Sequence, residues 1–323
     1  MFRIVRASVL ATLCALPAVP ALAADTYPER PIRLIVPFSP GGGTDINARI
    51  LAEPIGNLLG ETIVVDNRPG AASLLGSSIV AKATPDGYTL LLGTTSLTVA
   101  AAVYKEMPFS LDRDLLPITR VSDQPSILVV NPSLPAKTFK EFVALVRSRP
   151  GKLTFGSPGH GTSTHLAEEL LWMKINAQLL HVPFKGTGPA VTALLGNQIS
   201  TYLSTFASAL PHVKQNRLRA YAVTTLKRAE PLPDVPTLQE EGVQDYEYAA
   251  WYGLFVPANT PQKIVGKIHK AAVGALKSPQ VLAVYRKQGL NATPTTPAAF
   301  AKYIAAEKKK WAGVVREARI AQM

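Results

Sequence analysis

Short apolar runs alternate with longer segments of helical period along most of this chain, and this alternation restricts the fold more than any other feature. Runs of four or five β-favouring residues suit strands, whereas apolar residues three or four positions apart suit amphipathic helices. Strands and helices that alternate in this way form a parallel sheet with helices on both faces. The sequence therefore predicts an α/β fold.

The alternation comes in two series, which predict two domains. The first domain is expected to combine residues 25–126 with 227–323, and the second to span 127–226. Expected helices of the first series cover 45–59, where Pro54 predicts a kink or two short helices, and 71–83. The expected strands are 33–36, 62–65, 88–92, 127–130, 153–155, 180–183, 199–203, 218–223 and 251–257.

Two similar glycine loops stand at corresponding points of the two series. Residues 39–45 read SPGGGTD and residues 157–163 read SPGHGTS, so the match lies at an offset of 118 residues. Each loop follows an expected strand and precedes an expected helix. A helix N-terminus leaves backbone N–H groups unpaired and carries partial positive charge, and glycines let an anion approach it. Two such loops on facing domains predict a site for the two ends of a dianion.

The first 24 residues have the features of a secretory signal peptide. Arg3 and Arg6 precede an apolar stretch that ends in a small-x-small cleavage site, so cleavage is expected after Ala23 or Ala24. We therefore expect an exported, periplasmic protein. Cys14 is the only cysteine, so the mature chain has no disulfide and no thiolate nucleophile or ligand.

The charge of the chain favours anionic partners without indicating nucleic acid. Removing Arg3 and Arg6 lowers the formal net charge from +12 to +10. The basic residues are scattered, so a polyanion-binding protein is the third-ranked reading and no nucleic-acid partner is expected.

Catalytic and metal sites are less well supported than an anion site. A phosphate loop would need Lys-Ser/Thr after its glycines, but Thr44-Asp45 follows, and Asp45 is expected to cap the helix. No G-x-S-x-G motif occurs. A periplasmic serine hydrolase with His160 or His165 near Ser157 or Ser163 is the alternative function. The five histidines have no carboxylate partner at ligand spacing, so no metal or cofactor is expected. These five are His160, His165, His181, His212 and His269.

Two further segments are candidates for anion contact or for ordinary turns and caps. Lys185-Gly186-Thr187-Gly188 precedes a helix with Pro189 in its first turn. Residues 92–96, LGTTS, follow a strand and supply hydroxyl and N–H groups. The sequence leaves both alternatives open for each segment.

These motifs, in this order, resemble a known family over nearly the whole mature chain. They are YPERPIRLIVPFSPGGGTDINAR, VVDNRPGAA, ATPDGYTLLLGTTS, GSPGHGTSTHLAEEL, HVPFKGTGPAVTALLGNQI, ALPHVKQNRLRAYAVTT and WYGLFVPANTP. The chain is similar to the periplasmic solute receptors of the tripartite tricarboxylate transporter type, the Bug receptors.

The resemblance implies a two-domain periplasmic-binding-protein (Venus flytrap) fold with two crossover strands. It also implies a small organic carboxylate as ligand, held mainly through backbone groups and waters. The loops and the resemblance together predict a ligand site of 18 residues. They are Phe38, Ser39, Gly41, Gly42, Gly43, Thr44, Thr94, Thr95, Ser157, Gly159, His160, Gly161, Thr162, Lys185, Gly186, Thr187, Ser204 and Thr205.

One position departs from the family pattern. Family members often carry an acidic residue in the segment that here reads TYLSTFASALP, where this chain has Ser204 and Thr205. Such an acid could meet the ammonium group of an amino acid, so its absence favours a ligand without one. We expect a monomeric, non-enzymatic receptor for a di- or aromatic carboxylate, which serves a membrane permease or a sensor.

Overall fold

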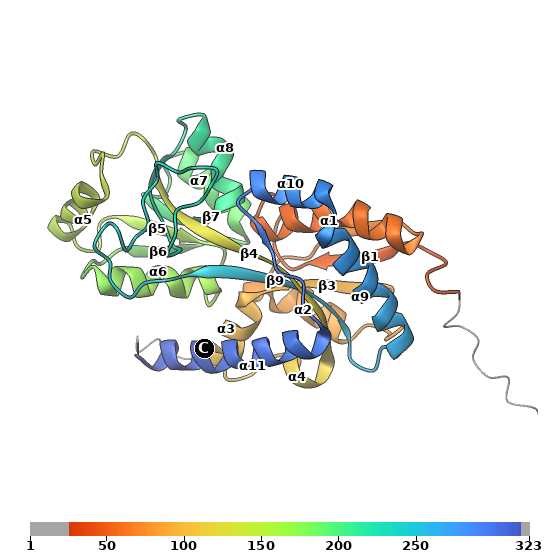
Figure 1. Ribbon diagram of the computed structural model, residues 1–323. Coiled ribbons are helices and arrows are strands. Elements are labelled where there is room, and N and C mark those ends of the chain that lie inside the picture. Colours follow the sequence, from red (N-terminus) through yellow and green to blue (C-terminus); the bar gives the residue numbers. More distant parts are fainter. Residues whose placement is uncertain (1–25, 318–323) are drawn as a thin grey trace, which may run out of the picture.

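The computed structural model describes residues 26–317, which form two α/β lobes joined by long strands (Figure 1). The predicted signal peptide, residues 1–24, lies outside the described residues. Within residues 26–317, no helix is both long and apolar enough to cross a membrane.

The first lobe is built on a sheet with strand order β2-β1-β3-β9-β4. Its strands are β1 (Ile32–Val36), β2 (Ile63–Asn67), β3 (Thr89–Thr94), β9 (Ala249–Pro257), the first part of β4 (Leu115–Val130) and the short β10 (Asn291–Ala292). Its helices are α1 (Gly43–Leu59), the 3-10 helix η2 (Ala71–Ser73), α2 (Leu74–Ala81), α3 (Thr95–Val103), α4 (Leu111–Asp114), α9 (Gln262–Lys277), α10 (Pro279–Lys287) and α11 (Pro297–Glu317).

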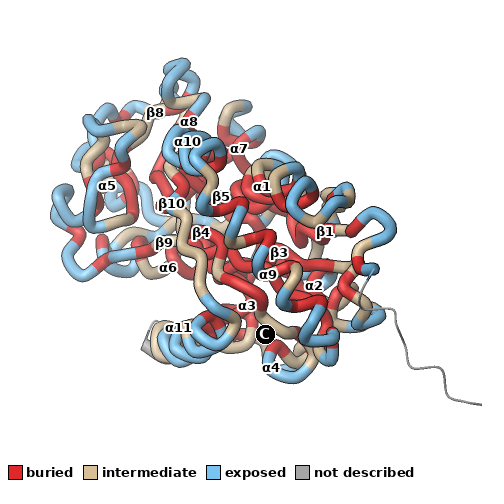
Figure 2. Tube along the Cα trace, turned by 45° about the vertical axis from the view of Figure 1, so that its right-hand side comes forward, coloured by how far each residue is buried: buried red, intermediate tan, exposed pale blue. Residues whose placement is uncertain are grey.

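Helices cover both faces of this sheet, as the sequence predicts. Successive residues of β1 point to opposite faces. Leu34 and Val36 pack in a core that includes Leu51 of α1, whereas Ile35 packs in a core that includes Phe300 of α11. Figure 1 shows α1 and α9 on one side of the strands and α2, α3 and α11 on the other. In Figure 2 the strands form a buried band between exposed helix surfaces.

The second lobe has strand order β4-β7-β5-β6, with β8 paired to the other edge of β4. Its strands are β5 (Thr154–Ser157), β6 (Leu180–Pro183), β7 (Thr201–Thr205), β8 (Arg219–Val223) and the last residues of β4. Its helices are α5 (Phe139–Ser148), α6 (Ser163–Lys174), α7 (Thr187–Leu195) and α8 (Phe206–Lys214). As in the first lobe, adjacent residues of β4 enter different cores, Leu128 with α6 and Val129 with α7.

Two strands connect the lobes, and they change the predicted sheet. β4 pairs antiparallel with β9 as far as Pro125, and from Ser126 it pairs antiparallel with β7 and β8. The expected strand 127–130 is therefore only the end of a 16-residue strand. The predicted parallel sheet is present in β2-β1-β3 and in β6-β5-β7, but the pairs that include β4 or β9 are antiparallel. β4 carries the chain out of the first lobe and β9 brings it back, so these two strands run in opposite directions. The two expected crossover strands are present.

Helix interiors also differ from the sequence expectations. α1 is one continuous helix with Pro54 inside it, so the expected pair of short helices is wrong. Its apolar side packs on α9, with Leu51 and Ile55 fully buried. The free energy of this packing offsets the loss of the backbone hydrogen bond that proline cannot donate. The expected helix 71–83 begins as a 3-10 turn with positive φ angles at Ala71, Ala72 and Ser73, and α2 follows.

The predicted domain boundaries stay a prediction, but contacts show where each segment lies. The change of partner along β4 lies next to the expected boundary at residue 126. The segment 227–248 contacts the second lobe: Leu238 N–H donates to the Val223 carbonyl of β8, and the Tyr246 hydroxyl donates to the Ala167 carbonyl of α6.

Candidate functional site

Five strand-to-helix junctions meet where the two lobes face each other. They lead into α1 and α3 in the first lobe and into α6, α7 and α8 in the second. Parallel strands end at the same edge of a sheet, which brings the helix N-termini that follow them together. Together with the start of β9, these five junctions enclose a cavity of about 30 Å³. It is lined by Phe38, Gly42, Gly43, Thr44, Thr94, Ser96, Pro158, Ser163, Thr164, Thr187, Thr205, Tyr248, Ala250 and Tyr252.

The cavity lining favours an anion through backbone groups. None of the lining residues is acidic or basic. Each helix N-terminus contributes unpaired N–H groups and a partial positive charge, on the order of half an elementary charge for a long helix. A bound carboxylate would meet these groups with no carboxylate side chain to repel it. The arrangement can therefore hold an anion without a formal counter-ion.

The first glycine loop is held in shape by Asp45. Gly41 has a φ of 80° and its N–H donates to Asp45 Oδ2 at 3.0 Å. Asn67 Nδ2 bridges Asp45 Oδ1 and the Phe38 carbonyl, and Arg49 pairs with the same carboxylate. Burial raises the pKa of Asp45, but hydrogen bonds from Arg49, Gly41 and Asn67 outweigh this, so the pKa is below its ordinary value. Asp45 therefore stabilises the loop, but the expectation that it caps α1 is wrong, because the N-cap is Gly42 and no side chain caps it.

The Gly41 N–H donates to Asp45 and is therefore not available to a ligand. The loop offers fewer backbone donors for an anion than the sequence predicts. Gly43 and Thr44 are the first two residues of α1, and N–H groups at those positions have no partner within the helix. Gly42, the N-cap, also lines the cavity. Among the residues of this loop that line the cavity, Gly42, Gly43 and Thr44 have backbone N–H groups that a ligand could use.

The second glycine loop repeats this geometry, but two residues away from the sequence match. Gly161 has a φ of 77°, and its N–H donates to the ring of His165 four residues later. Thr162 is the N-cap of α6, as Gly42 is of α1. The structural equivalents are thus Gly41 with Gly161 and Asp45 with His165. The repeated letters SPG identify two similar loops but not their equivalent residues.

Glycines also let the two lobes touch beside the cavity. Both Ser39 N–H and Ser39 Oγ donate to the Lys185 carbonyl, at 3.1 and 2.9 Å. Ser208 Oγ donates to the Gly41 carbonyl at 3.0 Å. A side chain at Gly188 would overlap the Pro40 carbonyl. The absence of side chains at these glycines therefore leaves room for the loop of the facing lobe. It also leaves the backbone accessible to a ligand.

Neutral hydroxyl groups complete the cavity wall. Tyr248 OH lies 2.9 Å from Ser163 Oγ, which lies 3.3 Å from Ser96 Oγ in the other lobe. Tyr252 OH donates to Gln124 Oε1 at 2.9 Å. Burial raises the pKa of both tyrosines, so both hydroxyls keep their protons at neutral pH. The hydroxyls of Ser96, Ser163 and Tyr248 can donate hydrogen bonds without adding charge, whereas Tyr252 OH already donates to Gln124.

The 18 predicted site residues divide into three groups by position. Seven line the cavity: Phe38, Gly42, Gly43, Thr44, Thr94, Thr187 and Thr205. Phe38, Gly159, His160 and Lys185 line an adjacent outer hollow of about 290 Å³. The remaining eight, Ser39, Gly41, Thr95, Ser157, Gly161, Thr162, Gly186 and Ser204, belong to the same loops and strand ends but line neither space.

Several of that last group have partners within the protein. Thr95 Oγ1 accepts a hydrogen bond from Trp251 N–H, and Ser204 Oγ donates to the Thr205 carbonyl. Thr162 Oγ1 donates to the Gly159 carbonyl and accepts from His165 N–H. They shape the walls of the site.

Sequence reasoning missed seven lining residues: Ser96, Pro158, Ser163, Thr164, Tyr248, Ala250 and Tyr252. Four of these lie in or next to a predicted motif, one or two residues beyond the predicted contact. Ala250 and Tyr252 alternate in β9 and Tyr248 directly precedes the strand in the same alternation, and alternate residues of a strand share a face. This alternation of residues could have indicated that one face of the segment forms a cavity wall, because the segment is one of the two crossover strands.

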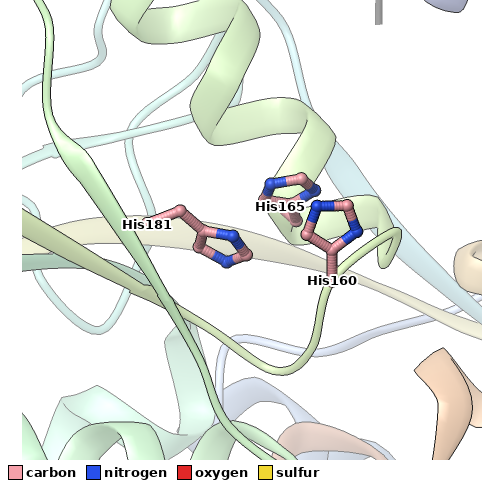
Figure 3. Close-up of side chains that lie close together, drawn as sticks. All are labelled: His160, His165 and His181. Carbon is pink, nitrogen blue, oxygen red and sulfur yellow. The ribbon is translucent and has the colours of Figure 1, made fainter. Parts of the chain in front are cut away.

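Three histidines gather beside the second glycine loop (Figure 3). The rings of His165 and His181 stack with centroids 4.0 Å apart, and the His160 ring lies 4.7 Å from that of His165. His165 Nε2 lies 3.5 Å from Glu169 Oε1, so the expectation that no histidine has a carboxylate partner is wrong. The spacing of four residues places His165 and Glu169 on one face of α6, and this is a sequence signal that could have found the pair.

Both candidate serines of the alternative hydrolase have partners other than the predicted histidines. Ser157 Oγ lies 2.6 Å from His181 Nε2, and Ser163 Oγ lies 2.9 Å from Tyr248 OH. Ser157 is fully buried. Burial and the neighbouring His165 and His160 lower the pKa of His181 to about 3. This pair is a buried structural contact.

Comparison with known proteins gives the family. The model of the tripartite tricarboxylate transporter family receptor matches residues 47–320. The chain belongs to this receptor family. Protein BugT of Bordetella pertussis is 37% identical over 298 residues, covering 92% of this chain and 91% of that protein. The family and the fold are those of solute-binding proteins, among them periplasmic binding proteins.

Two solved structures of similar proteins contain carboxylates. An R. palustris protein with adipate has a TM-score of 0.89 and 31% identity, covering 92% of this chain and all of that one. MatC from Rhodopseudomonas palustris with bound malate has a TM-score of 0.85 and 31% identity, covering 90% of this chain and all of that one. The resemblance to Bug receptors is thereby confirmed, together with the predicted fold.

Proposed function

We propose that the mature chain is a monomeric periplasmic receptor that binds a small dicarboxylate between its lobes and delivers it to a membrane transporter. The observation that carries this proposal is the cavity at which five helix N-termini meet without any acidic side chain. Two of these termini belong to one lobe and three to the other, so each lobe can hold one carboxylate. The adipate and malate found in two related structures have this chemistry.

The size of the cavity implies that the lobes move. A space of about 30 Å³ holds no more than a few water molecules, on the basis of roughly 10–15 Å³ for each. A dicarboxylate therefore enters only when the lobes separate, and it is then enclosed as they approach. β4 and β9 are the elements about which such a hinge motion would occur.

The lack of an acid in the lining also favours a ligand without an ammonium group. Ser204 and Thr205 stand where an acidic residue could meet an amino acid, and both are neutral and buried. An ammonium group placed among helix N-termini would be repelled rather than stabilised. We therefore expect dicarboxylates to bind far more tightly than glutamate or aspartate.

Calorimetric titration with a matched series tests this function. The series contains malate, succinate, adipate, terephthalate, citrate and glutamate, with adipamide as an uncharged copy of adipate. At least one dicarboxylate should bind with one molecule per chain, adipamide should not bind, and the bound ligand should be recovered unchanged. Failure of every carboxylate to bind, or equal binding of adipamide, would overturn the proposal. Uptake of the labelled ligand by cells with and without the gene distinguishes transport from sensing.

A further inference from the structure

Three histidines from three different segments bring ring nitrogens together outside the carboxylate cavity. His160 lies in the loop between β5 and α6, His165 in the first turn of α6 and His181 in β6 (Figure 3). One ring nitrogen from each histidine lies within 4.8 Å of the other two. No other group of three or more His, Cys, Asp or Glu residues within residues 26–317 comes together in this way.

Two of the rings already have the outer partners that metal-binding histidines need. His165 Nε2 lies 3.5 Å from Glu169 Oε1, and His181 Nε2 lies 2.6 Å from Ser157 Oγ. An oxygen at one ring nitrogen fixes the ring and leaves the other nitrogen for a metal. In both rings the nitrogen left over is Nδ1. In His165 it accepts a 3.3 Å hydrogen bond from Gly161 N–H, which a metal ion would displace.

We propose that His160, His165 and His181 bind one divalent transition-metal cation of the zinc type. Zinc binds imidazole nitrogens at about 2.0–2.1 Å, so three tetrahedral ligands lie about 3.4 Å apart. Separations of up to 4.8 Å must therefore shorten by no more than about 1.4 Å. His160 can supply most of this movement, because it is exposed and lies between Gly159 and Gly161, both with positive φ angles.

The ligand set selects the class of metal. Neutral imidazoles suit zinc, nickel and copper, whereas calcium and magnesium require mainly oxygen ligands. The exposed ring of His160 gives an ion access from solvent, and a fourth coordination position would be open to water on that side. A bound ion would tie the loop 158–162 to β6, and Pro158 of this loop lines the carboxylate cavity.

Metal titration of the mature chain without any affinity tag tests the site. Zn²⁺ affinity is measured by competition with a chromophoric chelator, and Co²⁺ is added as a probe because tetrahedral Co²⁺ absorbs visible light strongly. We expect one ion per chain and a tetrahedral Co²⁺ spectrum. The variant His160→Gln should weaken Zn²⁺ binding at least 10-fold. The matched variant His212→Gln changes a histidine in α8 outside the cluster and should bind Zn²⁺ like the wild type.

Two results would overturn the proposal. One is a wild-type chain that gives no tetrahedral Co²⁺ spectrum at one equivalent. The other is His160→Gln, folded by circular dichroism, with wild-type Zn²⁺ affinity. Because neither measurement uses a carboxylate, failure here leaves the receptor function untouched, and failure of the carboxylate screen leaves the metal site untouched.

Discussion

Replacing Gly42 by alanine tests how closely the two lobes must approach. Gly42 is the N-cap of α1, with φ −86° and ψ 167°, a conformation that alanine adopts without strain. Its new Cβ would lie 3.3 Å from Thr187 Cβ in the second lobe. Carbon atoms pack best at about 3.5–4.0 Å, so the lobes must separate by about 0.5 Å at this point.

That separation weakens the contacts between the lobes beside the cavity. Ser39 N–H donates to the Lys185 carbonyl at 3.1 Å, and Ser208 Oγ donates to the Gly41 carbonyl at 3.0 Å. About 0.5 Å more takes both to or beyond the range of useful hydrogen bonds. At about 1 kcal/mol each, their loss costs about 2 kcal/mol in the ligand-bound arrangement. The dissociation constant should therefore rise about 30-fold.

The stability of the fold should change much less than the affinity. Alanine is a poorer N-cap than glycine, but it also reduces the entropy of the unfolded chain, and the two effects offset each other to within about 1 kcal/mol. The matched control is Gly266→Ala, at an exposed position of α9 where a Cβ would meet no atom within 4 Å. Calorimetric titration with the tightest-binding carboxylate compares both variants with the wild type. Wild-type affinity in a folded Gly42→Ala chain would refute the reasoning.

Three further substitutions have defined outcomes. Asp45→Asn weakens the acceptor of Gly41 N–H and should cost about 1–3 kcal/mol at pH 7. Because the pKa of Asp45 is below its ordinary value, this deficit in thermal melts should shrink as the pH falls through that pKa. Burial raises the pKa of Glu168, so wild-type stability should decline as the pH rises above 4.5, and Glu168→Gln should not show this decline. Melts of both chains from pH 4.5 to 8 check it; parallel curves would contradict it. Tyr248→Phe removes a cavity-wall hydroxyl that we expect to donate to the ligand, so carboxylate binding measured by calorimetry should weaken about 10-fold; wild-type affinity would contradict this role.

Local sequence patterns were sufficient to predict where most strands lie in the sequence. They were not sufficient to predict how the strands pair in the sheet. The strand 180–183 is predicted at its observed bounds, and most other strands lie within two residues of theirs. The main exception is β4, because Pro117 and Pro125 interrupt its sequence pattern and only its last residues form a continuous apolar run. Its length depends on pairing with β9, which is more than 100 residues away in the sequence. A contact of that kind leaves no periodic signal.

Candidate site residues were predicted where a motif lies on a strand-to-helix junction and missed where the tertiary fold supplies them. The glycine and threonine positions at the starts of α1, α3, α7 and α8 follow from local sequence, and six of them line the cavity. Tyr252 comes from β9 and Tyr248 directly precedes it, and this strand approaches the junctions only because it crosses between the lobes. The histidine cluster was missed for the same reason, since His181 reaches it from a neighbouring strand.

The run Gly41-Gly42-Gly43 shows how one short motif meets several separate requirements. Gly41 needs a positive φ so that its N–H can reach Asp45. Gly42 faces Thr187 at a distance that leaves little room for a side chain, and a Cβ on Gly43 would overlap Tyr252. Each glycine is thus required by a different protein neighbour, one in its own helix, one in the facing lobe and one in the crossover strand. Because all three lack side chains, the backbone of this loop stays open toward the cavity, and the packing of the protein itself prepares the anion site that we propose.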